Sequence, residues 1–164
     1  MAGKTTIFNV VSRIYEPSKG LITFDGVDLL GLPRHRMARL GIARTFQNLA
    51  LFPTMTLLEN VMVGAHCRGR VGFVRAALRL NPWPEERRNR AEAHELLERL
   101  GLGPLAFRPA AGLPFGTLKR LEIARALAAK PRFLLMDEPA SGLTHAEVDE
   151  LGETIKQVRD DFGL

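Results

Sequence analysis

The chain contains little of what builds disulfide scaffolds or membrane spans. Cys67 is the only cysteine among 164 residues, so no intrachain disulfide can form and a disulfide-stabilised fold is excluded. No run of apolar residues approaches the roughly 18 that a membrane-spanning helix needs. We therefore expect a globular protein of the reducing cytosol, and a chain of this length can bury a sizeable core.

Aromatic residues make up only 7% of the chain, which bears on the partners of this basic protein. Lys and Arg number 23 against 18 Asp and Glu, and the net charge of +5 raises nucleic acids and acidic membranes as partners. Three of these five charges come from residues 68–99, where Glu95 and Arg99 stand four apart as on a solvated helix face. Few aromatic residues are interleaved to stack on bases, so we expect no nucleic-acid partner.

The first chemical motif is the tetrapeptide Gly3-Lys4-Thr5-Thr6, the second half of the phosphate-binding (Walker A) pattern G-x-x-x-x-G-K-[ST]. Apolar residues follow it at helical spacing, namely Ile7, Val10, Val11 and Ile14. The motif should therefore lie at a helix N-terminus, where N–H groups and the positive end of the dipole attract phosphate. We expect Lys4 to reach the outer phosphates of a nucleotide and Thr5 to offer its hydroxyl to Mg²⁺.

The second motif is an apolar run, 133–136, that ends in Asp137 and Glu138. The run, bounded by Pro131 and Pro139, predicts a buried strand of a parallel sheet, with both carboxylates at the edge where α/β proteins bind ligands. We expect Asp137 to hold Mg²⁺ through water and Glu138, on the opposite side, to orient or deprotonate an attacking water. The alternative is a simple turn after a strand, but Gly3-Lys4-Thr5 supplies the other half of a Mg·nucleotide site.

A third segment stands directly before that strand and reads L-P-F-G-T-L-K-R-L-E-I-A-R-A-L from residue 113 to 127. Its loop should open a helix whose apolar face consists of Leu121, Ala124, Leu127 and Ala128. The segment resembles the signature region of ATP-binding-cassette (ABC) ATPases, in which this loop closes on the γ-phosphate held by a second subunit. The resemblance implies that Gly116 and Thr117 contact nucleotide. Two positions depart from the family pattern, because Pro114 stands where Ser is frequent and Thr117 where Gln is typical.

A fourth segment, G-I-A-R-T-F-Q, runs from residue 41 to 47. Residues 42–46 predict a short strand that ends at Gln47. Taken alone, Gln47 could be an ordinary polar residue at a strand end. Its position between the other motifs is similar to the Q-loop of ABC ATPases, which implies that Gln47 touches Mg²⁺ or the attacking water and couples to a transmembrane partner.

The residues within the motifs are similar to those of one subgroup, the ATP-binding subunits of bacterial branched-chain amino acid importers, although urea, amide and lipopolysaccharide transporters use similar subunits. The resemblance implies ATP and Mg²⁺ as cofactors and hydrolysis that powers import. It implies transmembrane permease subunits and a second ABC ATPase subunit as partners, and indirectly a periplasmic solute-binding protein. It also implies a peripheral location at the cytoplasmic face of the inner membrane.

The expected fold is α/β: a P-loop NTPase (RecA-like) core with a small antiparallel β part and an inserted helical subdomain. Residues 1–48 and 119–164 should form the core and residues 49–118 the subdomain, which ends in the signature loop. Within these parts we expect a hairpin at 24–27 and helices near 57–65 and 84–100. The first phosphate-loop glycine and the switch histidine of the family are missing, so we expect an incomplete core that on its own binds ATP weakly and barely hydrolyses it.

Two alternatives remain open. The first is an ABC ATPase of DNA repair or translation, which the basic charge favours and which predicts ATPase activity stimulated by nucleic acid. The second is a non-catalytic fragment that only docks on a permease or on intact subunits. It predicts partner binding that Glu138→Gln leaves unchanged.

Overall fold

The computed structural model describes residues 2–45, 49–65 and 84–164. Gln47 and all of residues 66–83, between the helices expected at 57–65 and 84–100, lie outside these ranges.

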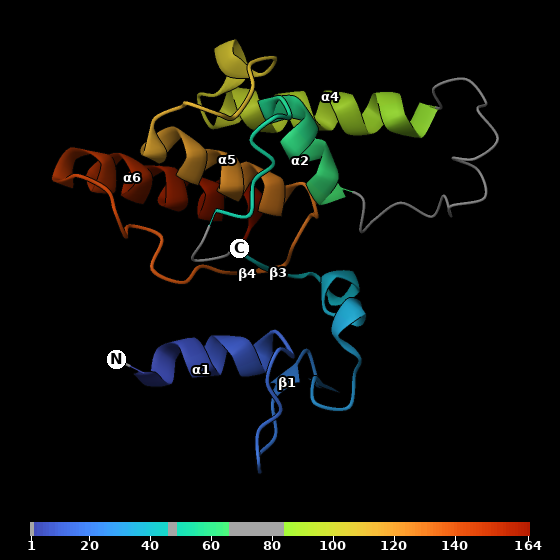
Figure 1. Cartoon of the computed structure of the whole chain (residues 1–164). Coiled ribbons are helices and arrows are strands. Elements are labelled where there is room, and N and C mark those ends of the chain that lie inside the picture. Colours follow the sequence, from blue (N-terminus) through green and yellow to red (C-terminus); the bar gives the residue numbers. More distant parts are fainter. Residues whose placement is uncertain (1, 46–48, 66–83) are drawn as a thin grey trace.

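Two groups of elements lie on either side of a short pair of parallel strands, and we count these strands with the second group (Figure 1). We call residues 49–65, 84–130 and 139–164 the helical region; its elements are α2 (Leu57–Ala65), α4 (Pro84–Arg99), the 3-10 turn η4 (Gly103–Leu105), α5 (Phe115–Leu127) and α6 (His145–Phe162). We call residues 2–45 and 131–138 the sheet region; its elements are α1 (Ala2–Val11), β1 (Thr23–Phe24), β2 (Val27–Asp28), the 3-10 turns η1 (Arg34–Arg36) and η2 (Ala38–Leu40), β3 (Ile42–Arg44) and β4 (Phe133–Leu135).

The expected hairpin is confirmed. β1 pairs with β2 in antiparallel register, with Phe24 opposite Val27. Asp25 and Gly26 form the turn with φ values of 50° and 76°. A type I′ turn requires positive φ at both central residues, which Asp-Gly tolerates better than most pairs.

The two expected core strands are also present, as a parallel pair. β3 and β4 lie in register with Ile42 opposite Phe133 and Arg44 opposite Leu135. The expectation of a fully buried β4 is wrong in part, because the Phe133 side chain is 43% exposed and only Leu135 is buried. Within the described residues β4 has a strand neighbour on one side only, and the Phe133 ring lies 6.0 Å from the Phe24 ring.

The helical region holds the larger apolar core. The four residues that the sequence assigns to the inner face of α5 (Leu121, Ala124, Leu127 and Ala128) are all buried there, against α2, α4 and α6. Gly101, with φ of 68°, follows the end of α4, which confirms the helix stop expected at this glycine.

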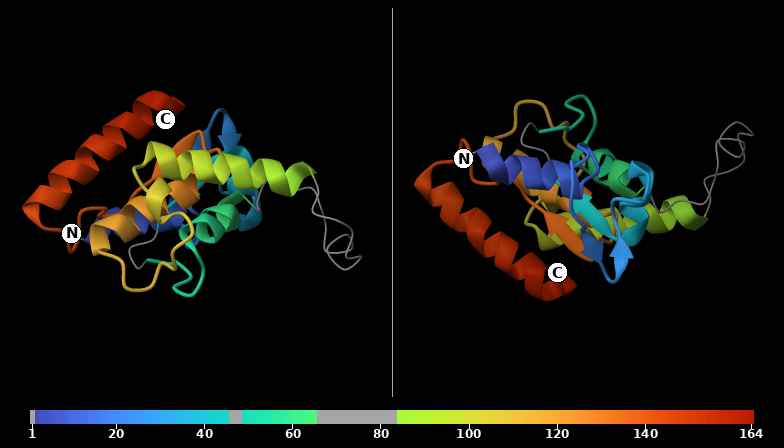
Figure 2. Two further views of the ribbon diagram at one scale, coloured as in Figure 1. Left: turned by 90° about the horizontal axis from the view of Figure 1, so that it is seen from above. Right: turned by 90° about the horizontal axis from the view of Figure 1, so that it is seen from below.

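The sheet region encloses a smaller cluster of four buried side chains, formed by Leu29, Met37, Ile42 and Leu135. Phe8 and Val11 of α1 pack against it. The view from below shows the C-terminal part of α1 beside the two parallel strands (Figure 2). Of the apolar residues that the sequence places at helical spacing, Ile7 does not pack inward, because it is 63% exposed; Phe8 packs against the cluster instead.

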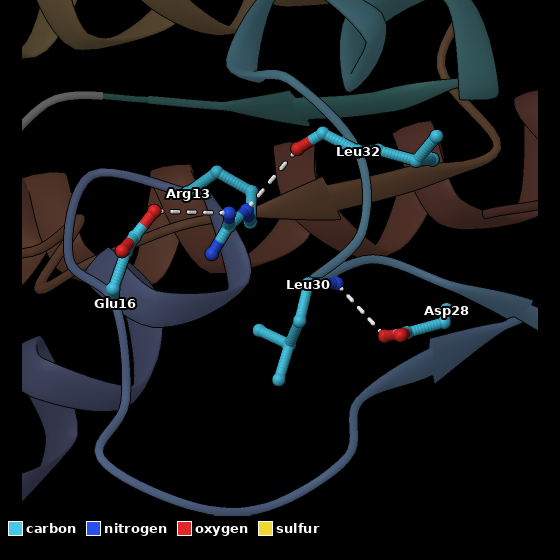
Figure 3. Close-up of polar contacts among 5 residues, drawn as sticks. All are labelled: Arg13, Glu16, Asp28, Leu30 and Leu32. Atoms are coloured by element: carbon cyan, nitrogen blue, oxygen red, sulfur yellow. Dashed lines mark hydrogen bonds and ion pairs between the residues drawn. The ribbon is translucent and has the colours of Figure 1, made fainter.

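Polar contacts attach the end of α1 to the chain that follows the hairpin (Figure 3). Arg13 Nε donates to the Leu32 carbonyl at 3.2 Å, and its guanidinium pairs with Glu16 at 3.3 Å. The Asp28 carboxylate accepts from the Leu30 N–H at 2.9 Å. In the parts of the chain that are described, no helix has the length and apolar character needed to cross a bilayer.

Candidate functional site

The phosphate-binding motif lies where the sequence predicts it. α1 begins at Ala2, so Gly3, Lys4, Thr5 and Thr6 form its first turn. The Gly3 and Lys4 residues are exposed, and a Cβ placed on Gly3 would meet no atom within 4 Å. The first turn of a helix directs N–H groups outward without intrahelical acceptors. This end of α1 is therefore an open position at which an anion is favoured.

The two carboxylates after β4 face different environments, as expected. Asp137 is buried, whereas Glu138 is exposed. Glu138 has a φ of 46°, in the left-handed region that non-glycine residues rarely adopt. The Ser141 N–H donates to the Glu138 carbonyl at 3.0 Å, which closes the turn. This sharp change of direction after β4 keeps one carboxylate inside and the other in solvent.

Arg44, the last residue of β3, joins these two parts of the site. Its Nη1 donates to Asn9 Oδ1 at 2.7 Å and to the Ser12 hydroxyl at 3.4 Å. Its Nη2 pairs with Asp137 Oδ2 at 3.3 Å. The Phe8 ring lies 5.8 Å from the guanidinium carbon. One side chain thus contacts both α1 and the carboxylate that follows β4.

The ion pair is sheltered from solvent, because the Arg44 side chain is 11% exposed and that of Asp137 is 6% exposed. A buried charge without a partner is strongly unfavourable, so each group requires the other. Sequence reasoning missed Arg44. A signal was available, since Arg44 is a charged residue within the strand expected at 42–46.

The signature loop contacts α6. α5 begins at Phe115, so Gly116 and Thr117 lie in its first turn, and the Thr117 residue is 7% exposed. A Cβ on Gly116 would lie 3.1 Å from the Glu147 carboxylate, and a Cβ on Gly142 would lie 3.1 Å from the Phe115 ring.

The Glu147 carboxylate also belongs to the N-cap of α6. It accepts from the N–H and the hydroxyl of Thr144, at 2.9 Å each. The Thr144 N–H, then the Thr144 hydroxyl and more weakly the Gly116 N–H lower the pKa of Glu147. One carboxylate therefore caps the N-terminus of α6 and lies beside the first turn of α5 at Gly116.

The structure brings Asp137 to α1 through Arg44, and places Gly116 and Thr117 against α6 in the helical region. Gln47 lies outside the described residues. In the described ranges, no group of three or more His, Cys, Asp and Glu side chains could hold a metal ion by itself.

Comparison with known proteins supports the resemblance to ABC ATPases that the motifs indicate. A family model described as "ABC transporter" matches residues 2–141. The branched-chain amino acid transport ATP-binding protein BraF of Pseudomonas aeruginosa is 42% identical over 99% of this chain and 64% of its own length. The Escherichia coli protein LivG, with the same description, is 41% identical over 97% of this chain and 63% of its own.

Solved structures agree. The ADP conformation of MJ1267, an ATP-binding cassette of an ABC transporter, has a TM-score of 0.81 and 29% identity over 98% of this chain and 63% of its own. Dimeric MJ0796, another such cassette, has a TM-score of 0.75 and 27% identity over 98% of this chain and 66% of its own.

The fold is thus the α/β P-loop NTPase fold of ATP-binding cassettes, as expected from the order of the motifs. The chain belongs to the ABC transporter family. It spans about 64% of the length of the curated relatives that it matches.

Proposed function

We propose that this chain is the ATP-binding and ATP-hydrolysing part of an ABC transporter subunit that powers import of branched-chain amino acids or a related solute. The observation that carries the proposal is the junction at Arg44, which holds the helix of the G-K-T-T motif against Asp137. The identity to BraF and LivG supports the transport role over one in DNA repair or translation.

The residues at the start of α1 fit a nucleotide. The open first turn offers N–H groups of Gly3 to Thr6 to phosphate oxygens, and Lys4 adds an exposed positive charge. A Cβ on Gly3 would meet nothing within 4 Å, so the backbone there is accessible to a ligand. We assign Lys4 to the outer phosphates.

The oxygen donors present fit Mg²⁺. Magnesium takes hard oxygen ligands and is usually held by one or two protein groups together with substrate phosphates, so it needs no cage of side chains. Thr5 would supply a hydroxyl, Asp137 a carboxylate, most simply through water, and Gln47 an amide oxygen. When bound, the ion neutralises charge that develops on the phosphates.

Glu138 is the candidate catalytic residue. Its exposed position after β4 leaves the carboxylate available to orient or accept a proton from a water molecule. Gly116 and Thr117 of a second ABC ATPase subunit would complete the site. The remaining partners are permease subunits and, through them, a periplasmic solute-binding protein, at the cytoplasmic face of the inner membrane. The division into a core (1–48 and 119–164) and a helical subdomain (49–118) is part of the proposal.

The first test compares nucleotide binding by Lys4→Ala with binding by Lys19→Ala. Both residues are exposed lysines of the sheet region, but only Lys4 lies at the start of α1. Titration of the full chain with a fluorescent ATP analogue and Mg²⁺ should show binding weakened about 10-fold or more by Lys4→Ala, the loss of one charge-assisted contact. Binding should be unchanged in Lys19→Ala. Equal affinities in both variants would contradict the proposal.

The second test separates binding from hydrolysis. Where the native protein hydrolyses ATP, Glu138→Gln should retain Mg·ATP binding and lower hydrolysis by about 100-fold or more, since general base catalysis contributes roughly that much. Unchanged hydrolysis would remove Glu138 from the catalytic role. A native protein in which neither binding nor hydrolysis occurs would favour the docking fragment.

A further inference from the structure

We propose that Arg44 is a positioning residue of the nucleotide site, which sets Asp137, a residue that would hold Mg²⁺, at a fixed place relative to the α1 helix. This inference rests on the proposed function and adds to it a residue that touches neither nucleotide nor metal. Its basis is the juxtaposition of Asn9, Arg44 and Asp137, which come from three different elements of the chain.

The geometry divides the guanidinium between two tasks. The Nη1 group donates to Asn9 Oδ1 of α1 at 2.7 Å and to the hydroxyl of Ser12, the residue after α1, at 3.4 Å. The Nη2 group is used on Asp137, at 3.3 Å. A planar guanidinium holds its donors in a fixed fork, so the two acceptors are kept in a fixed relation to each other.

Little else that is described connects these elements. The sheet region buries only four apolar side chains in its cluster, and α1 adds Phe8 and Val11 at the margin of that cluster. The Phe8 ring faces the guanidinium at 5.8 Å, so even this apolar contact includes Arg44. Besides this apolar packing, Arg44 is a polar link between α1 and the residue Asp137 that follows β4.

Arg44 could affect Mg²⁺ affinity in two opposite directions, so the direction of the change on removing Arg44 tests the inference. A positive charge beside Asp137 opposes a cation, so an Arg44 that only neutralised Asp137 would weaken Mg²⁺ binding, and its removal would strengthen it. A positioning Arg44 acts the other way, because its removal lets Asp137 and α1 move apart. Groups that orient metal ligands typically account for about 10- to 100-fold in metal affinity.

The experiment measures the Mg²⁺ concentration for half-maximal binding of a fluorescent ADP analogue by the full chain. Arg44→Ala should raise this concentration about 10-fold or more, and Arg44→Lys should raise it less, because one ammonium cannot serve both acceptors. Arg39→Ala is the matched control, since Arg39 is an exposed arginine just before β3. It should leave the concentration unchanged, and analogue binding in EDTA should be the same for all variants.

An unchanged or lower Mg²⁺ requirement in Arg44→Ala would overturn the inference. If Arg44→Ala does not fold, Asn9→Ala decides, since it removes one acceptor on α1 and leaves the ion pair with Asp137 intact. It should raise the Mg²⁺ requirement in the same direction by a smaller factor, and no change would again overturn the inference.

The proposed function can fail separately. The proposed nucleotide site is refuted if the native chain binds no nucleotide, or if the Lys4→Ala variant binds nucleotide as well as the native chain does. Only the positioning role is refuted if nucleotide binding depends on Lys4 but the Mg²⁺ requirement is the same with and without Arg44. A readout without nucleotide adds to this: the melting temperature shifts of Asn9→Ala and Arg44→Ala should be clearly non-additive in the double variant.

Discussion

The helical region and the sheet region differ in the amount of apolar core that their described residues form. Among the described residues, the helical region buries seventeen apolar side chains in one cluster, whereas the cluster of the sheet region has four. The start of α1, Asp137 and Glu138 all belong to the sheet region. Among the described residues, the helical region thus forms the larger apolar cluster, and the candidate site residues lie in the region with the smaller cluster, where Arg44 adds polar contacts.

The largest expected effect comes from one leucine in each region. Leu97 of α4 and Leu29 after β2 are both fully buried, so Leu→Ala removes the same atoms in two environments. We expect Leu97→Ala to lower the free energy of unfolding by about 4–5 kcal/mol and Leu29→Ala by about 2–3 kcal/mol. The smaller cost follows because the partly exposed neighbours of Leu29 can relax into the cavity. Urea denaturation measures both, and equal costs would remove the distinction between the regions.

The next effect tests how closely the helices of the helical region pack. A Cβ on Gly64 of α2 would lie 2.0 Å from the carbonyl oxygen of Arg125 in α5, so Gly64→Ala must separate the two helices. We expect a loss of about 1–3 kcal/mol. Gly152→Ala is the control, because a Cβ there meets nothing within 4 Å, and it should stabilise α6 by about 0.5–1 kcal/mol. Thermal melts report both, and destabilisation by the two changes alike would contradict the close contact.

A smaller effect concerns the N-cap of α6, where the helical region relies on polar contacts. The Thr144 hydroxyl accepts from the Glu147 N–H in a capping box, and Thr144→Ala should cost about 1 kcal/mol. Val158→Ala in the buried face of α6 should cost more than this cap. Chemical denaturation at neutral pH would rank the two, and the reverse order would contradict the dominance of apolar packing.

The same cap makes a pH prediction. The folded-state pKa of Glu147 is lowered, chiefly by the Thr144 N–H. Its contribution is therefore complete above the usual Glu pKa of about 4.3 and is lost as the pH falls through the lower folded value. Thr144→Ala should make stability less sensitive to pH on this acid side. Parallel pH profiles for the two proteins would show that the cap does not act through Glu147.

The smallest expected effect is at the surface between α5 and α6. Arg120 pairs with Glu150 at 2.7 Å, with the Glu150 side chain 59% exposed. Arg120→Ala should cost about 0.2–1 kcal/mol, and added salt should reduce the cost, because exposed ion pairs are screened. Lys156→Ala, whose partner Glu153 lies within α6, should cost no more. A loss above that range would mean that ion pairs and not apolar packing join these helices.

The helical region follows closely from its sequence. Apolar residues at helical spacing identify the inner face of α5, and Gly101 marks the end of α4. These signals are local, because the spacing of apolar residues along a few turns determines which face of a helix is buried. The hairpin was predictable for a similar reason, since Asp25-Gly26 suits a turn with two positive φ values.

The site region was predictable only in part. The motifs placed Lys4 at a helix start and Asp137 at a strand end, because each signal lies within a few residues. The Arg44 contacts join residues 35 and 93 positions away, so no local pattern contains them. The exposure of Ile7 and Phe133 was missed for the same reason, because it depends on which distant elements cover α1 and β4.

The most direct test of the account is amide hydrogen exchange of the full chain with and without Mg·ADP. Binding at the proposed site should protect peptides that cover α1 and residues 133–138, while the interiors of α2 and α4 exchange as before. Lys4→Ala should abolish this protection. Protection confined to the helical region, or protection that Lys4→Ala leaves intact, would contradict the assignment of the nucleotide site to the sheet region.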